Sequence, residues 1–209
     1  MPRKFIELHK IYGEAEIKSK NYTIKSEVWR EDSTYGNLAY DEIWKPLTEV
    51  GRPYICLVQN DNLHMMTDHP TETVTNQHFI DRAKGDVLIF GMGLGLIIFP
   101  LLEDSEITSI TVVEMDEHLI NDVSSIIKSK DSRGILKIVN GDAFEYHKQI
   151  DTEKFDTIYF DIWQNVDDKA YTEMNFLHRS YHKFLKSSDS FMDSWLYFQR
   201  LKIVKSQIS

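Results

Sequence analysis

Four apolar runs between residues 86 and 161 alternate with helix-like segments, and this alternation constrains the fold more than any other feature of the sequence. Buried strands that alternate with helices are typical of a parallel sheet covered by helices. The runs cover residues 86–90, 110–114, 136–140 and 155–161. The sequence therefore predicts an α/β fold, with a Rossmann-like, doubly wound and mostly parallel sheet.

The first apolar run ends in a glycine turn, Gly91-Met-Gly93-Leu-Gly95, and a helix over residues 96–103 is expected to come next. Glycines let a ligand approach bare backbone. In the dinucleotide-binding fingerprint, Gly-x-Gly-x-x-Gly, the third glycine comes one residue later than here. No basic or hydroxyl residue follows to help bind a phosphate. The turn therefore favours a nucleoside ligand without phosphates, such as S-adenosylmethionine.

Acidic residues stand at the ends of the later runs, where open α/β sheets bind ligands. Glu114 falls 19 residues after Gly95, near the roughly 20-residue spacing at which an acid meets ribose hydroxyls. Asp142 and Asp161 end the third and fourth runs. An aspartate after a strand is also a common helix N-cap, so Asp116 and Asp142 have a second, structural interpretation.

These motifs resemble the class I S-adenosylmethionine-dependent methyltransferases, most closely the spermidine-synthase-like branch and its short bacteriophage and bacterial members. The resemblance covers residues 86–163 well and residues 63–85 loosely. It implies strand order 3-2-1-4-5, with S-adenosylmethionine across the ends of the first three strands. The implied contacts are the methionine part beside Gly91, Gly93 and Gly95, the ribose on Glu114, and the adenine amino group on Asp142 and Ala143.

After the fourth run the sequence departs from the polyamine synthases of this branch, which carry Asp-Ser-Ser-Asp-Pro there. The corresponding residues here are Asp161-Ile-Trp163-Gln-Asn165. The acid that serves as base is kept, and the acid that grips the amine substrate is lost, which argues against aminopropyl transfer to a dication. Methyl transfer to a small-molecule acceptor, with Asp161 as the catalytic residue, is the predicted activity.

Two other functions stay open. One is aminopropyl transfer or another cleavage at the sulfonium, and the other is S-adenosylmethionine binding without catalysis, as a module or a subunit. Two more residues are candidates for substrate contact. Trp163 is either a wall for an aromatic or cationic substrate or a packing residue. Glu72, on the first turn of a helix expected over residues 70–84, faces either solvent or the cofactor site.

Residues 1–68 are predicted to form a small β-rich appendage, and residues 69–209 the S-adenosylmethionine-binding domain. Asp68 is expected to cap the helix over residues 70–84. The other elements expected in the appendage are antiparallel strands over residues 5–17 and 22–29 with Asn21 near their turn, a helix over 36–50, and a hairpin of 53–59 and 63–66.

The C-terminal part is predicted to be shorter than in a full class I methyltransferase, because only 48 residues follow Asp161. A helix over residues 168–186 is expected, then one strand or an amphipathic helix within residues 191–208. The terminal hairpin of the full fold is predicted to be missing, which leaves an open sheet edge. Either this aromatic segment or a second copy of the chain, in a homodimer, would cover the edge.

Composition excludes several function classes. The net charge of −9 argues against nucleic acid as a partner, and Cys56, the only cysteine, is expected to be a buried apolar residue. His178 and His182 have a helical spacing that can bind metal, but without a third ligand no metal site is predicted. Without a long apolar run or a signal segment, the expectation is a soluble cytoplasmic enzyme with no membrane partner.

Overall fold

The larger sheet has five parallel strands in the order β7-β6-β5-β8-β9. The computed structural model describes residues 3–13, 17–28, 51–60, 63–164 and 166–197. Numbered along the chain, this order is 3-2-1-4-5, so the predicted strand order is confirmed. The strands are β5 Gly85–Phe90, β6 Ile107–Glu114, β7 Leu136–Asn140, β8 Thr157–Phe160 and β9 Phe191–Ser194.

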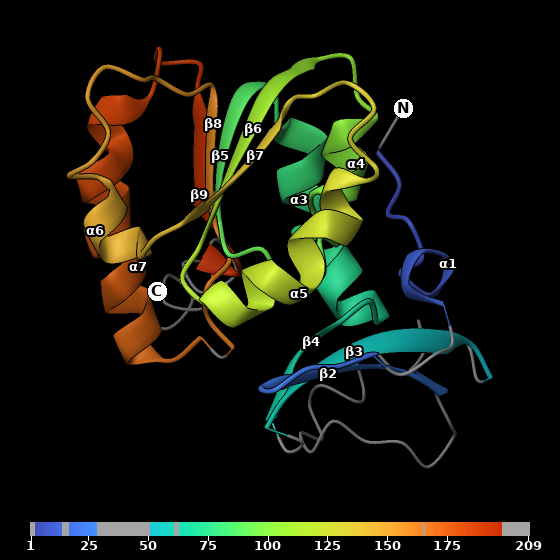
Figure 1. Cartoon of the computed structure of the whole chain (residues 1–209). Coiled ribbons are helices and arrows are strands. Elements are labelled where there is room, and N and C mark those ends of the chain that lie inside the picture. The colour runs from blue at the N-terminus through green and yellow to red at the C-terminus, as the bar shows by residue number, and fades with distance from the viewer. Residues whose placement is uncertain (1–2, 14–16, 29–50, 61–62, 165, 198–209) are drawn as a thin grey trace, which may run out of the picture.

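Helices cover both faces of this sheet, so the predicted doubly wound fold is confirmed (Figure 1). Val87 and Ile89 of β5 belong to one buried cluster, and Leu88 and Phe90 to the other. This alternation results from the two-residue period of a strand. The first face carries α3 Pro70–Arg82, α4 Phe99–Leu102 and α5 Glu117–Lys128, and the second carries α6 Ala143–Tyr146, α7 Asp168–Tyr181 and the 3₁₀ helix η2 His182–Phe184.

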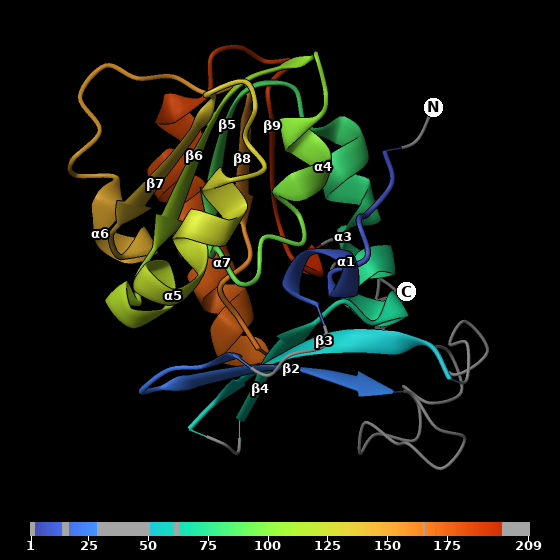
Figure 2. The ribbon, with the colours of Figure 1, turned by 45° about the vertical axis from the view of Figure 1, so that its right-hand side comes forward.

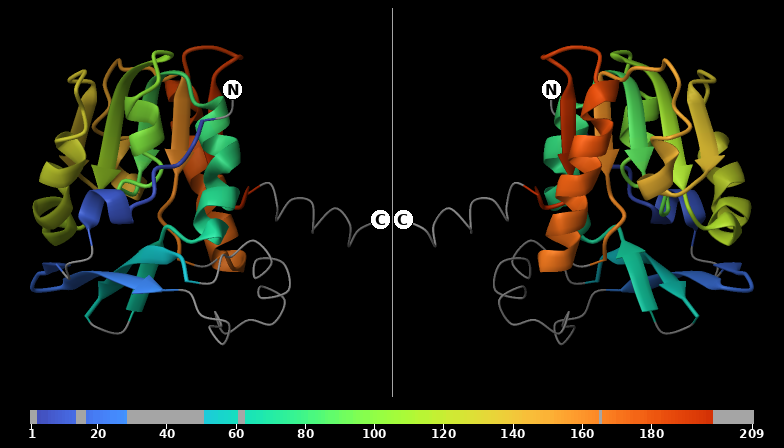
Figure 3. Two further views of the ribbon diagram at one scale, coloured as in Figure 1. Left: turned by 90° about the vertical axis from the view of Figure 1, so that its right-hand side faces the viewer. Right: turned by 90° about the vertical axis from the view of Figure 1, so that its left-hand side faces the viewer.

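A second, antiparallel sheet of four strands lies across the carboxyl ends of the large sheet (Figures 2 and 3). Its core residues, such as Ile24 and Leu57, join the same buried cluster as β5 and α5. The two sheets therefore share a core, and the boundary at residue 68 stays a prediction. The strands are β1 Ile17–Lys18, β2 Tyr22–Val28, β3 Pro53–Gln59 and β4 Leu63–Thr67.

The first 68 residues match their predicted structure only in part. The hairpin is confirmed, since β3 pairs antiparallel with β4. The strand expected over residues 5–17 is wrong, because this segment contains the short helix α1 His9–Tyr12 and only the start of β1. Tyr12, the last residue of α1, packs into the core there. The helix expected over residues 36–50 lies outside the described residues.

Asp68 does not cap α3, so that prediction is wrong. Its side chain is buried, and its two carboxylate oxygens accept hydrogen bonds from the backbone amides of Leu8 (2.8 Å) and Ile55 (2.7 Å). Buried amides need acceptors, and these two belong to the N-terminal segment and to β3. Asp68 therefore ties both segments to the start of α3.

The helices after the glycine turn and after β8 are shorter than expected. The helix predicted over residues 96–103 begins only at Phe99, because the chain turns through residues 93–98. The helix predicted over residues 168–186 ends at Tyr181 and continues as η2. Residues 191–194 form the strand β9, while most of the predicted aromatic segment lies outside the described residues. Within the described part, no helix is long and apolar enough to cross a membrane.

Replacing Asp68 tests whether its carboxylate links the N-terminal segment and β3 to the start of α3. Asp68→Ala leaves the buried amides of Leu8 and Ile55 without acceptors, so we expect it to lower the free energy of unfolding by roughly 2–4 kcal/mol. Urea unfolding measures the difference. The control is Asp81→Ala, which removes an exposed carboxylate that accepts a hydrogen bond from the amide of Arg3 (3.1 Å). Equal small losses in both variants would contradict the structural role of Asp68.

Candidate functional site

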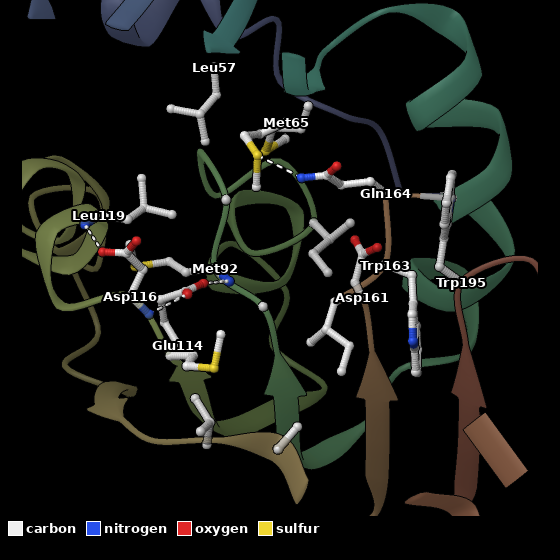
Figure 4. A pocket seen from close by; sticks show the side chains of 18 of the residues that line it. Leu57, Met65, Met92, Glu114, Asp116, Leu119, Asp161, Trp163, Gln164 and Trp195 are labelled. Carbon is white, nitrogen blue, oxygen red and sulfur yellow. Dashed lines mark hydrogen bonds between the residues drawn. The ribbon is translucent and has the colours of Figure 1, made fainter. Parts of the chain in front are cut away.

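A cavity of about 530 Å³ opens at the carboxyl ends of the large sheet, beneath the small sheet (Figure 4). Such a volume is typical of small-molecule sites, and strand carboxyl ends are the usual place for one. No lysine, arginine or histidine lies among the described residues that line it. The six acidic lining residues are Glu72, Glu114, Asp116, Asp142, Asp161 and Glu173.

The glycine turn forms the floor of the cavity. Gly91 and Gly93 line it, both with positive φ (93° and 47°), and a Cβ on Gly91 would overlap the carbonyl oxygen of Asp161. A larger residue at Gly91 would therefore push β5 away from β8. Gly95 lies behind the floor, where its Cα packs closely against Ile127 and Phe99. The structure therefore does not bring Gly95 to the cavity surface with the other two glycines.

Residues from the N-terminal part of the chain bond both backbone polar groups of Leu94, in the glycine turn. The hydroxyl of Tyr12 donates a hydrogen bond to the carbonyl oxygen of Leu94 (2.7 Å). The amide of Leu94 donates to the thioether sulfur of Met66 (3.0 Å). Both backbone polar groups of Leu94 are therefore satisfied by residues that precede β5.

Glu114, at the end of β6, points into the cavity in a fixed orientation. Its Oε2 accepts a hydrogen bond from the amide of Met92 (2.9 Å), and its Oε1 accepts one from the amide of Asp116 (2.9 Å). A carboxylate has about four acceptor positions, so each oxygen retains capacity for a ligand hydroxyl. The side chain predicted to bind ribose is thus aligned before any ligand arrives.

The small sheet contributes polar residues that the sequence analysis missed. Tyr22 of β2 donates a hydrogen bond through its hydroxyl to Oδ2 of Asp116 (2.5 Å), and Gln59 of β3 donates to the Tyr22 hydroxyl (3.2 Å). Tyr22 and Gln59 are direct partners in the β2–β3 ladder. Burial is the main cause that raises the pKa of Tyr22, so its hydroxyl stays protonated. No linear motif marks either residue, because only the docking of the two sheets brings them to Asp116.

Asp116 and Asp142 are both helix N-caps, as their second interpretation predicts. Oδ1 of Asp116 accepts hydrogen bonds from the amides of His118 and Leu119 at the start of α5. Oδ1 of Asp142 accepts one from the amide of Phe144 at the start of α6 (2.8 Å). Both caps also line the cavity, as does Ala143. Capping and ligand binding are therefore compatible here, since one carboxylate oxygen serves the helix.

Asp161 and Glu72 place two more carboxyl groups in the cavity. Asp161 follows β8, and Glu72 lies on the first turn of α3. Glu72 thus faces the cavity, and the solvent alternative is wrong. Burial raises the pKa of Asp161 to about 7. Burial, together with the negative charge of Asp161, raises the pKa of Glu72 to about 8.

Trp163 and Trp195 line the cavity near Asp161 (Figure 4). The indole nitrogen of Trp163 donates a hydrogen bond to Oε2 of Glu173 on α7 (2.9 Å), and that of Trp195 donates to Oγ1 of Thr75 on α3 (2.9 Å). Trp163 was recognised from sequence. Trp195 was assigned only to an aromatic segment, because its distance from the other motifs gives no sign that β9 returns it to the site.

The raised pKa of Glu72 predicts how the free energy of unfolding depends on pH. From pH 4.5 to about 8 the unfolded chain has lost the Glu72 proton while the folded chain retains it, so the free energy of unfolding falls as pH rises through this window. Glu72→Gln removes that penalty. We expect its melting temperature to exceed that of the wild type clearly at pH 8.5 and little at pH 5. Glu103→Gln, an exposed change of the same kind, is the control, and an identical pH profile for both variants would contradict the assignment.

The comparisons with known proteins agree with this architecture. Residues 64–187 match the family model described as "Spermine/spermidine synthase domain", and no curated protein matches the chain. A solved spermidine synthase in complex with the transition state analogue AdoDATO is similar in fold, with a TM-score of 0.51 and 16% identity over 82% of this chain and 54% of that chain. Spermidine synthase from Thermotoga maritima gives a TM-score of 0.49 and 16% identity over 82% of this chain and 52% of that chain.

This chain therefore spans about half the length of those two synthases. A further solved structure, the N-methyltransferase NodS from Bradyrhizobium japonicum WM9, gives a TM-score of 0.45 and 17% identity over 58% of this chain and 66% of that one. The family model covers more than half of the chain, which confirms the resemblance inferred from the motifs. The chain belongs to the spermine/spermidine synthase domain family.

Proposed function

We propose that the protein binds S-adenosylmethionine and transfers its methyl group to a small-molecule acceptor. The observation that carries this proposal is the charge pattern of the cavity, which has six acidic and no basic side chains among its described lining residues. A cationic ligand without phosphate is stabilised there by Coulomb attraction, whereas a nucleotide phosphate would be repelled. S-adenosylmethionine is a nucleoside with a sulfonium and fits both conditions.

The proposed orientation of the ligand depends on the order of the strands. Glu114, fixed by two backbone amides, accepts the ribose hydroxyls. Asp142 and Ala143, at the neighbouring end of β7, hold the adenine. Gly91 and Gly93 leave room for the methionine part, which brings the sulfonium toward Asp161.

Asp161 is the proposed base. The ligand supplies a methyl group on a sulfonium, whose transfer depends mainly on alignment with the acceptor. Asp161 accepts the proton that the acceptor loses, and its pKa of about 7 suits it for this task at neutral pH. Because the base must be deprotonated, kcat/KM should rise as the pH passes through about 7.

A second candidate, aminopropyl transfer, is favoured by one specific observation. Glu72 of α3 contributes a second carboxyl group close enough to Asp161 for their charges to interact. The second acid that the polyamine synthases carry after this strand has no counterpart here. The absence of a cation from the described lining also suits a ligand without a carboxylate, such as decarboxylated S-adenosylmethionine. Supplying each sulfonium compound and identifying the nucleoside product separates the two activities.

Glu114→Ala tests the binding site. We expect it to weaken S-adenosylmethionine binding by roughly 2–4 kcal/mol, because it removes hydrogen bonds between a carboxylate and the ribose. Isothermal titration calorimetry measures the change, and circular dichroism checks the fold. The control is Glu117→Ala, an exposed acid on the first turn of α5 that lies outside the cavity lining. Equal affinity in wild type and Glu114→Ala would place the ribose elsewhere.

Asp161→Asn tests the chemistry. We expect turnover to fall by about 10²-fold or more while cofactor affinity changes little, because the amide cannot accept the acceptor's proton. Chromatography identifies the products: S-adenosylhomocysteine reports methyl transfer, methylthioadenosine reports aminopropyl-type transfer, and unchanged ligand reports binding without catalysis. Loss of affinity at an unchanged catalytic rate would assign Asp161 to the cofactor.

A further inference from the structure

Two tryptophan rings are held rigidly on one side of the cavity. The only hydrogen-bond donor of each indole side chain is already used, by Glu173 for Trp163 and by Thr75 for Trp195. Neither ring nitrogen therefore needs a ligand partner, and the anchored rings can offer only their apolar π surface. An aromatic surface whose orientation is fixed in advance recognises flat apolar groups and cations at little entropic cost.

The carboxyl groups of Glu72 and Asp161 belong to the same side of the cavity. Thr75, which anchors Trp195, lies three residues after Glu72 on α3, and residues at this spacing share one helix face. Asp161 and Trp163 are two residues apart after β8. Glu114, the acid assigned to the ribose, and its neighbour Asp116 lie on the opposite side (Figure 4). The cavity therefore has two halves of different chemistry.

We propose that the half formed by Trp163, Trp195, Glu72 and Asp161 binds the acceptor, and that the acceptor is an amine with a single ammonium group on a flat apolar body. The carboxyl groups take the ammonium group, and the indole rings take the apolar body. This inference rests on the proposed function for the transfer step, but the binding preference can be measured without that step.

The charge of the carboxyl pair supports one ammonium group rather than two. With a pKa of about 7 for Asp161 and of about 8 for Glu72, the pair carries about one negative charge at pH 7.5. A single cation balances that charge, whereas the second ammonium group of a diamine would have no carboxylate partner in this pair, and its methylene chain would cover less of the indole faces than a flat body. Desolvating an unpaired charge is costly, so a diamine is the poorer fit.

The proposed transfer step needs only the ammonium group of the acceptor, the Asp161 carboxylate and the methyl group on the sulfonium. The ammonium group gives one proton to the Asp161 carboxylate and becomes a neutral amine. The amine nitrogen then uses its lone pair to bond the methyl carbon, while the electrons of the carbon–sulfur bond pass to sulfur and leave a neutral thioether. The product is a methylated ammonium ion, and Asp161 afterwards releases its proton to water.

Three probe molecules test the binding preference by calorimetry at pH 7.5, with and without S-adenosylhomocysteine. They are 2-phenylethylamine, 1,4-diaminobutane, and 2-phenylethanol, which lacks the charge. We expect 2-phenylethylamine to bind at least about tenfold more tightly than either of the others. Equal or tighter binding of the diamine, equal binding of the alcohol, or no binding of 2-phenylethylamine in either state would overturn the proposal.

Matched substitutions test the role of the rings. Trp163→Leu and Trp195→Leu should each weaken 2-phenylethylamine binding by about tenfold, while Trp163→Phe and Trp195→Phe, which keep a π face, should restore most of it. S-adenosylmethionine affinity should stay unchanged in all four. Unchanged 2-phenylethylamine affinity in both leucine variants would refute the aromatic wall. The proposed function fails on a different result, namely S-adenosylmethionine that does not bind or is not cleaved.

Discussion

The register of the parallel strands brings the whole site together. Phe90 of β5 pairs with Val113 of β6 and with Phe160 of β8. The residues immediately after these three positions, Gly91, Glu114 and Asp161, therefore emerge at one level along the sheet edge. Because a shift of one residue would turn each side chain to the other face, the position of the site depends on the apolar pattern that fixes this register. The cavity is a consequence of how the core packs.

Local sequence was sufficient to predict the large sheet and the residues at its strand ends. The strand order, Glu114, Asp142 and Asp161 all depend on short apolar runs and on the residues directly after each run. Asp68 shows where this reasoning fails. Its position before a helix is a typical capping signal, but the amides that bind it lie 60 and 13 residues away in sequence, and no local pattern reveals them.

The site residues that the sequence analysis missed reach the cavity through packing between helices and sheets. Tyr22, Gln59 and Trp195 reach the cavity because the small sheet and β9 lie against it. Glu72 was ambiguous because the helical phase of α3 was not fixed by its sequence, which has weak amphipathic character. Each of these contributions depends on the relative orientation of whole elements, which a single sequence does not encode in any short motif.

Burial is the main reason why the pKa of Asp161 is raised to about 7 and that of Glu72 to about 8, and the negative charge of Asp161 adds to the shift of Glu72. Six carboxyl groups line about 530 Å³ with no described cation among them, and like charges in a partly dry space disfavour one another. Burial opposes ionisation of Asp116, but hydrogen bonds from the Tyr22 hydroxyl and from the amides of Leu119 and His118 lower its pKa. Asp161 and Glu72 instead retain their protons to higher pH, chiefly because they are buried. The buried acids therefore lower the stability of the folded chain near neutral pH, and under the proposed function they favour a positive ligand.

The two hydrogen bonds to the backbone N–H and C=O of Leu94 bear on how the chain folds. One partner, Tyr12, precedes Leu94 by 82 residues, and the other, Met66, by 28. Contacts of such separation form late, because the loop that they close loses much chain entropy. We therefore expect the glycine turn to acquire its final shape only after the N-terminal segment has docked. A fragment that begins at residue 69 would lose both supports of the turn, so the shape of the cavity floor depends on the N-terminal segment and the small sheet as well as on the large sheet.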